Sequence, residues 1–273
     1  MLARRFVACD LVFTEHPGHA SELALHHAPH YDVIFALGGD GTVMEVAGAM
    51  VGSHTPIGVL AGGTGNLLAR ALGIPLSIRG AVPALLAGKE VAIDLGRFDS
   101  GRRFAIAAGV GIDASMVAET PGWLKRRLGV LAYMVMGSRA ALRAVLRRDL
   151  FDARVTIDGV VHQQRAAAVM IANFGAVLGK RLTLGPEIRT NDGLLDACVF
   201  SPGTIHDAIR IMWCMLRGDF RTHPCISYFR GRSIQVETIP SLQWQADGDL
   251  IGMTPFSVVV EPLAVRLLVP QRP

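Results

Sequence analysis

Three glycines surround a single aspartate in the segment Gly38-Gly-Asp-Gly-Thr42, which directly follows the apolar run 33–37. Glycine lacks a Cβ, so the backbone can bend sharply and bring its N–H groups close to a ligand. A helix that begins near Thr42 would point its positive N-terminal end at the same place, which favours an anion. Since Asp40 would repel a phosphate unless a cation lay between them, the segment indicates nucleotide phosphates together with Mg²⁺. An ordinary turn between a strand and a helix explains three glycines equally well.

A second loop of the same kind, Ala61-Gly-Gly-Thr-Gly-Asn66, follows the apolar run 57–60 and precedes a helical pattern over 67–72. Two successive strand–loop–helix units place both loops at one edge of a parallel sheet, where open α/β sheets bind ligands. The sequence contains no Gly-x-x-x-x-Gly-Lys-Ser/Thr, and no Gly-x-Gly-x-x-Gly opens a helix after a strand. We therefore expect phosphate binding without a P-loop.

The pattern of elements changes near residue 94. Before it, strands alternate with helical segments, which predicts a Rossmann-like α/β nucleotide domain over residues 1–93. After it, short strands and turns dominate, which predicts a β-rich, β-sandwich-like domain over 94–273 that is interrupted by helical segments at about 122–148 and 204–217. We expect the active site in the cleft between the two domains.

Composition agrees with an α/β protein. Of the 273 residues 51% are apolar and only 6% aromatic. No run of 18 apolar residues predicts a membrane span, and the N-terminus lacks the apolar region of a signal peptide. The four cysteines form no Cys-x-x-Cys pair, which is typical of a reducing compartment. We therefore expect a cytoplasmic protein.

Six short motifs occur in the order typical of one family. They are 38–45 (GGDGTVME), 63–66 (GTGN), 94–97 (DLGR), 109–113 (GVGID), 191–196 (NDGLLD) and 247–249 (DGD). With these motifs the chain, from about Thr14 to Pro270, resembles the diacylglycerol kinase catalytic-domain family of bacterial lipid kinases. The resemblance implies transfer of the γ-phosphate of ATP to the hydroxyl of diacylglycerol or a related lipid.

The resemblance also implies which residues bind ATP. They are Thr14, Gly38, Gly39, Asp40, Gly41, Thr42, Val43, Met44, Glu45, Gly63, Thr64 and Asn66. Met44 stands where the family commonly has Asn, a change that is tolerable if the backbone supplies the phosphate contacts.

For the acidic motifs the resemblance implies chemistry that the residues alone leave open. It makes Asp247 the general base that accepts the proton of the lipid hydroxyl. Because the family usually has Asp-Gly-Glu here, Asp249 is a shortened third member, and we keep both carboxylates as catalytic candidates. The resemblance further implies a Mg²⁺ bound by the Asp192 carboxylate and by the backbone carbonyls of Arg189 and Leu194. Taken by themselves, both motifs are also ordinary turns.

The start of the chain departs from the family pattern. Family members usually begin with a strand and an Asn-Pro-x-Ser-Gly phosphate loop, whereas this sequence opens where the second strand is expected, at 6–14. Truncation is the reading we favour, because losing the first strand of a sheet would expose a long edge. The other reading is that the protein lacks one nucleotide-binding element.

The formal net charge is +4 and the sequence pI is about 9.1. Basic residues concentrate in 122–149, where Arg139, Arg143 and Arg147 share a helix face beside apolar residues. This segment predicts peripheral docking on an anionic membrane that carries the lipid substrate, although a solvated helix face explains it equally well. Nucleic acid is disfavoured, because aromatics are few and no binding motif accompanies the charge. A homodimer is kept as an expected assembly.

Three functions remain open from the sequence. The first is the lipid kinase. The second is a soluble-substrate kinase of the NAD kinase type, which shares Gly-Gly-Asp-Gly loops. The third is an inactive relic that binds a lipid or a nucleotide. Nothing in the sequence identifies the lipid, because acyl pockets consist of generic apolar residues.

Overall fold

The structure is a computed structural model, and it describes residues 6–111, 150–175, 188–204, 206–207, 209–211, 213 and 224–271. The chain divides into two compact units. Unit 1 comprises residues 1–93 and 263–273, and unit 2 comprises residues 94–262. The helical segment predicted at 122–148, together with the face predicted to dock on a membrane, lies outside the described residues.

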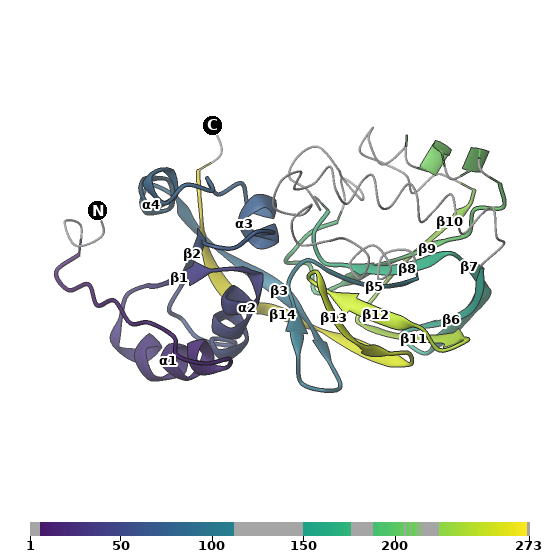
Figure 1. Ribbon diagram of the computed structural model, residues 1–273, viewed down its shortest axis with the longest axis horizontal. Helices are drawn as coiled ribbons and strands as arrows, with labels where there is room; N and C mark the ends of the chain where they lie inside the picture. The colour runs from purple at the N-terminus through teal and green to yellow at the C-terminus, as the bar shows by residue number, and fades with distance from the viewer. Residues whose placement is uncertain are drawn as a thin grey trace. The chain divides into compact units, whose positions relative to one another are not determined.

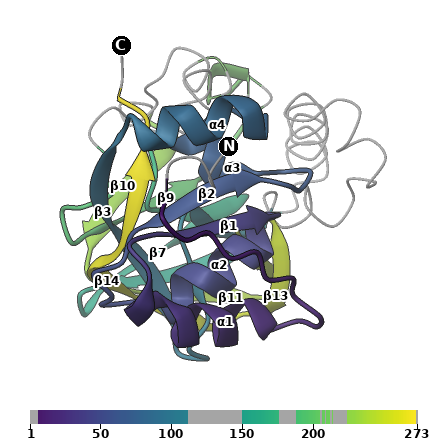
Figure 2. The same ribbon diagram turned by 90° about the vertical axis from the view of Figure 1, so that its left-hand side faces the viewer.

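Unit 1 is built on parallel strands with helices on both faces. Its helices are α1 (His19–His27), η2 (Ala28–His30), α2 (Asp40–Ala49), α3 (Leu67–Ala71) and α4 (Ile78–Leu86), and its strands are β1 (Ile34–Gly38) and β2 (Ile57–Ala61). Figures 1 and 2 show α1 and α2 on one side of β1 and β2, and α3 and α4 on the other. This arrangement confirms the predicted Rossmann-like α/β domain.

Two strands have residues in both units. They are β3 (Lys89–Phe98) and β14 (Phe256–Val269). In unit 1, Leu267 of β14 pairs in parallel with Ile57 of β2. The sheet order is β1-β2-β14-β11-β6-β7, and β3 pairs with β14.

The strand expected at 6–14 is not formed. The described part of this segment has no regular secondary structure, and Leu11, Val12 and Phe13 are 75%, 50% and 74% exposed. In the sheet order β1 is a terminal strand whose described partner is β2. Apolar, β-prone residues alone do not make a strand, because the backbone groups also need a neighbouring strand to pair with.

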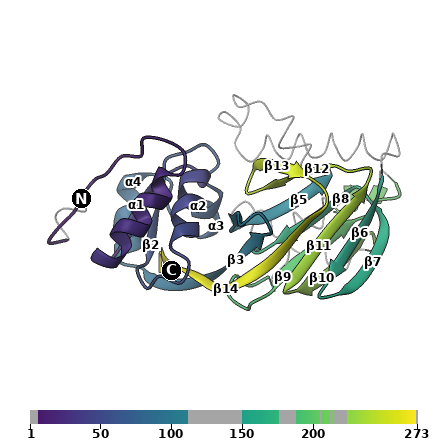
Figure 3. The same cartoon turned by 90° about the horizontal axis from the view of Figure 1, so that it is seen from below.

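Unit 2 is a sandwich of two sheets. Its strands, besides its parts of β3 and β14, are β4 (Arg103–Phe104), β5 (Ala107–Gly111), β6 (Phe151–Ile157), β7 (Val160–Ala166), β8 (Ala168–Ala172), β9 (Leu195–Phe200), β10 (Ile226–Gly231), β11 (Ser233–Ile239), β12 (Gln243–Ala246) and β13 (Asp249–Met253). In one sheet β11, β6 and β7 lie side by side, as Figure 3 shows. The other has the order β10-β9-β8-β5-β12-β13, so the predicted β-sandwich-like domain is confirmed.

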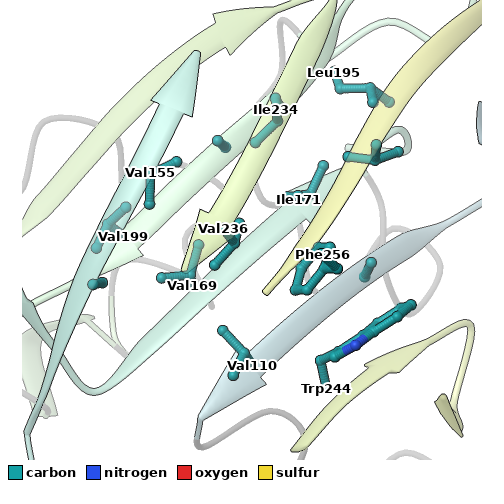
Figure 4. Packing of buried hydrophobic residues seen from close by; sticks show 14 of the residues in the cluster. Val110, Val155, Val169, Ile171, Leu195, Val199, Ile234, Val236, Trp244 and Phe256 are labelled. Carbon is teal, nitrogen blue, oxygen red and sulfur yellow. The ribbon is translucent and has the colours of Figure 1, made fainter. Parts of the chain in front are cut away.

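The core of unit 2 fills the space between these sheets (Figure 4). Val155, Val236 and Phe256 come from one sheet, and Ile171 and Trp244 come from the other. The Trp244 and Phe256 rings stack with centroids 4.5 Å apart. Such interdigitated aromatic and branched side chains give a rigid support for the loops at the strand ends.

Candidate functional site

The first glycine-rich loop joins β1 to α2. Gly39 is the N-cap residue, and the helix begins at Asp40. The N–H groups of a first helical turn, together with the helix dipole, favour an anion here. Since β1 and β2 are parallel and in register up to Gly38 and Ala61, the second loop begins beside the first, as predicted.

The two loops touch through their backbones. The N–H of Gly62 donates to the carbonyl of Gly38 at 2.8 Å. A Cβ on Gly63 would lie 2.5 Å from the Cα of Gly39, so any side chain there would push the loops apart. Asn66 closes the second loop, because its Oδ1 accepts from the Gly63 N–H at 2.9 Å and its Nδ2 donates to the Gly63 carbonyl at 2.7 Å.

Asp40 fixes the second loop as well. Its Oδ1 accepts from the N–H of Leu67 at 2.6 Å and from that of Leu68 at 3.4 Å, so the carboxylate caps α3. A Cβ on Gly65 would lie only 2.7 Å from Oδ2 of Asp40. The sequence predicts a phosphate contact for Asp40 but not this cap, because the donors come from the end of the second loop.

Gly39 and Gly41 have no packing reason to be glycine. A Cβ on Gly41 would meet no neighbouring atom within 4 Å, and one on Gly39 would make an ordinary 3.6 Å contact with the Cα of Gly63. Gly39 also has φ −80, which any residue adopts. The close approach of a ligand to the backbone would account for both glycines. Gly63, by contrast, is required by its contact with Gly39.

The other residues expected to bind ATP differ in how far their side chains are buried. Val43 is 3% exposed, so its side chain belongs to the core of unit 1. The Oε1 of Glu45 accepts from the N–H of Gly18 at 3.0 Å, and the Glu45 carbonyl accepts from the Ser21 hydroxyl at 3.0 Å. Glu45 therefore anchors α1 to α2. Thr14 and Thr64 are exposed, whereas Thr42 and Met44 are half-buried.

Asp247 lies in a two-residue hairpin turn between β12 and β13. Asp247 has φ 47 and Gly248 has φ 89, and Ala246 pairs with Asp249. Positive φ at both turn residues is the geometry that Asp-Gly favours in hairpins. The ordinary turn expected from the sequence is therefore present.

The Asp247 carboxylate does more than a turn requires. Its Oδ2 accepts from the N–H of Ala105 at 2.8 Å, and its Oδ1 accepts from those of Ile106 and Ala107 at 2.9 and 3.1 Å. Hydrogen bonds from three backbone donors stabilise an ionised carboxylate and fix its orientation. The motif at 247–249 points to Asp247, but nothing in the sequence indicates these donors.

Asp249 is in a different environment. Its side chain is 61% exposed, and its Oδ2 lies 2.9 Å from Nη2 of Arg102. Exposed ion pairs of this kind contribute little to stability. Of the two catalytic candidates, Asp247 is thus the one that is held rigidly.

In the loop expected to bind Mg²⁺, the Asp192 carboxylate pairs with the guanidinium of Arg230. The other oxygen of Asp192 accepts from the N–H of Leu194 at 3.1 Å. Arg189 is exposed. One carboxylate and two backbone carbonyls are the hard oxygen donors that suit Mg²⁺, but Arg230 already neutralises the carboxylate. A cation at this loop would therefore compete with Arg230.

The same guanidinium serves a second carboxylate. Nε of Arg230 lies 3.0 Å from Oδ1 of Asp196, which also accepts from the hydroxyl of Tyr228. Asp196 is fully buried, and this burial raises its pKa. Burial, together with the Asp196 carboxylate, raises the pKa of Tyr228 as well. Within the described residues no group of three or more His, Cys, Asp or Glu side chains is arranged to hold a metal.

Comparison with known proteins decides the family. The model described as diacylglycerol kinase catalytic domain matches residues 1–98, and the model described as YegS C-terminal NAD kinase beta sandwich-like domain matches residues 105–269. A diacylglycerol kinase of Staphylococcus aureus (strain bovine RF122 / ET3-1) is 30% identical over 86% of this chain and 73% of its own length. The chain belongs to the diacylglycerol kinase family. The resemblance seen in the motifs is thereby confirmed.

One further relative and two solved structures are also similar to this chain. An uncharacterized protein of Synechocystis is 32% identical over 87% of this chain, which spans 54% of that relative. Two structures from Bacillus anthracis str. Sterne, one described as a diacylglycerol kinase, match at TM-scores of 0.74 and 0.80. They are 21% and 23% identical, and each match covers 98% of this chain and 87% or 86% of theirs. This likeness shows the fold.

Membership of the diacylglycerol kinase family supports a nucleotide-binding kinase. Part of one family motif, including Asp113, lies outside the described residues. Within the residues described, no helix is long and apolar enough to cross a bilayer.

Proposed function

We propose that this protein transfers the γ-phosphate of ATP to the hydroxyl of diacylglycerol or a related lipid. The two glycine-rich loops of unit 1 bind the phosphates of ATP. Asp247 of unit 2 accepts the proton of the lipid hydroxyl.

One observation carries the nucleotide half of the proposal. Gly39 and Gly41 leave space at the N-terminus of α2 that no packing inside unit 1 requires. If phosphate oxygens bind the backbone N–H groups of this first turn, as we propose, a Cβ at either position would hinder their close approach. The contact between the two loops keeps these donors fixed before the ligand arrives, so little ordering is needed on binding.

The geometry of Asp247 suits phosphoryl transfer. In this reaction the enzyme mainly positions the partners and neutralises charge, because the transferred group carries its charge in a loose transition state. A strongly basic side chain is then not required. A carboxylate held by three backbone donors offers a fixed acceptor for the proton, and Asp249 with its exposed side chain is the weaker candidate.

Mg²⁺ is part of the proposal in two places. With ATP, it would neutralise phosphate charge near Asp40, whose carboxylate lies at the contact between the loops. At the second place, Arg189, Asp192 and Leu194 would hold it as a structural ion, in competition with Arg230.

We further propose that the protein works at a membrane surface in the cytoplasm. Support comes from the sequence of 122–149, where basic residues outnumber acids and where Arg139, Arg143 and Arg147 would share one face of the helix that the sequence predicts. Anionic lipid headgroups would attract this face and bring the enzyme to its substrate. A homodimer remains part of the proposal.

The choice of acceptor is tested with radiolabelled ATP and Mg²⁺. Vesicles containing diacylglycerol in an anionic lipid background are one substrate, and NAD in solution is the other. The lipid kinase proposal predicts labelled lipid and no labelled NAD. Labelled NAD alone would establish the soluble-substrate alternative, and label in neither acceptor would favour the inactive relic.

A further inference from the structure

The buried side chain of Asn173 lies behind the segment that holds Asp247. Asn173 follows β8 and is fully buried. Its Nδ2 donates to the carbonyl of Ala105 at 2.9 Å and to the carbonyl of Asp94 at 2.7 Å. One amide group therefore joins the start of the segment Ala105–Ala107 to β3.

The backbone of this segment is hydrogen-bonded throughout. Its three N–H groups donate to the Asp247 carboxylate. Its carbonyls accept: that of Ala105 from Nδ2 of Asn173, that of Ile106 from the Asn173 N–H at 2.9 Å, and that of Ala107 from the Asp247 N–H at 2.9 Å. Every backbone donor and acceptor of the segment is bonded, and each acceptor is reached by Asn173 or Asp247.

The contact with Asp94 extends the network to the second acidic loop. Oδ2 of Asp94 accepts from the N–H of Gly193 at 2.7 Å, and the Asp94 N–H donates to the carbonyl of Thr190 at 2.6 Å. Asp94 is fully buried. Through Asp94, Asn173 thus connects the support of Asp247 with the loop that contains Asp192.

Burial of the Asn173 side chain costs free energy. Its Oδ1 is buried and meets no hydrogen-bond donor among the described residues. An unsatisfied buried acceptor costs about 1–3 kcal/mol. The two donated bonds are what an apolar side chain of similar size would not supply.

We infer that Asn173 is a positioning residue for the proposed base: it fixes the backbone of Ala105–Ala107, whose N–H groups orient the Asp247 carboxylate. This inference rests on the proposed function only for its effect on turnover. The hydrogen-bond network itself can be tested without any activity.

The test compares two variants of the 273-residue chain. Asn173→Ala removes both donated bonds. Thr238→Val is the matched control, because Thr238 is also buried in unit 2 and its hydroxyl bonds Thr254 Oγ1 at 2.5 Å and the Pro240 carbonyl at 2.8 Å. Both variants lose a buried polar group, but only the group lost in Asn173→Ala bonds the segment Ala105–Ala107.

Amide hydrogen exchange is the readout that does not depend on turnover. In Asn173→Ala the amides of Ala105–Ala107 should exchange faster, approaching the rates found in Asp247→Ala, where their acceptor is gone. In Thr238→Val they should keep native rates. Native exchange of these amides in Asn173→Ala would overturn the inference, whatever the enzyme phosphorylates.

Turnover supplies the second readout. Asn173→Ala should lower kcat by about 10- to 100-fold, because a small displacement of a catalytic group has this effect, while KM for ATP stays unchanged. Asn173→Asp adds a pH signature: an ionised carboxylate cannot donate to two carbonyls, whereas a protonated one can donate to one. Its activity relative to the native enzyme should therefore rise as the pH is lowered. An unchanged kcat in Asn173→Ala would overturn the positioning role, and an inactive native enzyme would instead refute the proposed function.

Discussion

Gly41→Ala should separate ligand binding from folding. A Cβ at this position meets no neighbouring atom within 4 Å, and the residue lies in the first turn of α2. Alanine is favoured over glycine inside helices by up to about 1 kcal/mol, so the variant should be at least as stable as the native protein. If ATP phosphates approach this backbone, the added methyl group should displace them from one N–H donor. A hydrogen bond to a charged group contributes about 1.5–3 kcal/mol, so Kd for ATP should rise about 10- to 100-fold.

Gly63→Ala, in contrast, should lower the stability of the protein. Its Cβ would lie 2.5 Å from the Cα of Gly39, and overpacking of this kind costs about 1–3 kcal/mol. For a protein of this size, each kcal/mol lowers Tm by about 2–4 °C. Gly252→Ala in β13 is the control, since its Cβ would make an ordinary 3.5 Å contact with Trp244 in unit 2 and should leave ATP affinity unchanged.

Calorimetric titration with ATP and thermal unfolding, done on the three variants together, measure both quantities. A stable Gly41→Ala protein that binds ATP with native affinity would refute the reasoning. So would a loss of affinity in Gly252→Ala as large as that in Gly41→Ala.

Four further outcomes are expected. Asp247→Ala should lower kcat by about 10²- to 10⁴-fold with little change in ATP affinity, and a native kcat would contradict the role of base. Because three N–H groups lose their acceptor, the free energy of unfolding should also fall by about 1–3 kcal/mol. Asp249→Asn should change stability by less than about 1 kcal/mol and kcat only mildly, and a larger loss of kcat than in Asp247→Ala would move the base two residues along. Arg230→Gln should increase the rise in Tm that Mg²⁺ causes, because it frees Asp192, whereas an unchanged response would argue against an ion at this loop. Burial raises the pKa of Asp196, so the folded state holds its proton to higher pH than the unfolded state does. The stability of the native protein relative to Asp196→Asn should therefore fall as the pH rises from the usual aspartate range through this raised pKa. A difference in Tm between the two proteins that does not change with pH would contradict the shift.

Local patterns predicted the elements that depend on neighbouring residues. Both glycine-rich loops follow strands and precede helices, and Asp247-Gly248 forms the hairpin turn that this dipeptide favours. The alternation of strands and helices before residue 94, and the strand-rich pattern after it, also predicted the two types of fold correctly.

Contacts between distant segments were not predictable. The donors to the Asp247 carboxylate come from residues 140 to 142 positions earlier, and Asp40 caps a helix that begins 27 positions later. Arg230 pairs with Asp192 across 38 positions. None of these partners has a local signal, because they meet only once the sheets have formed. The strand expected at 6–14 failed for a related reason, since its apolar residues meet no pairing strand among the described residues.

Phosphate binding by the two glycine loops is the step on which the proposed kinase function depends. Amide NMR spectra recorded during titration with ATP, ADP and adenosine test it directly. We predict that ATP and ADP shift the amide signals of 38–42 and 62–66 most strongly, and that adenosine barely moves them. Equal shifts with adenosine, or the largest shifts among residues of unit 2, would contradict phosphate binding at these loops.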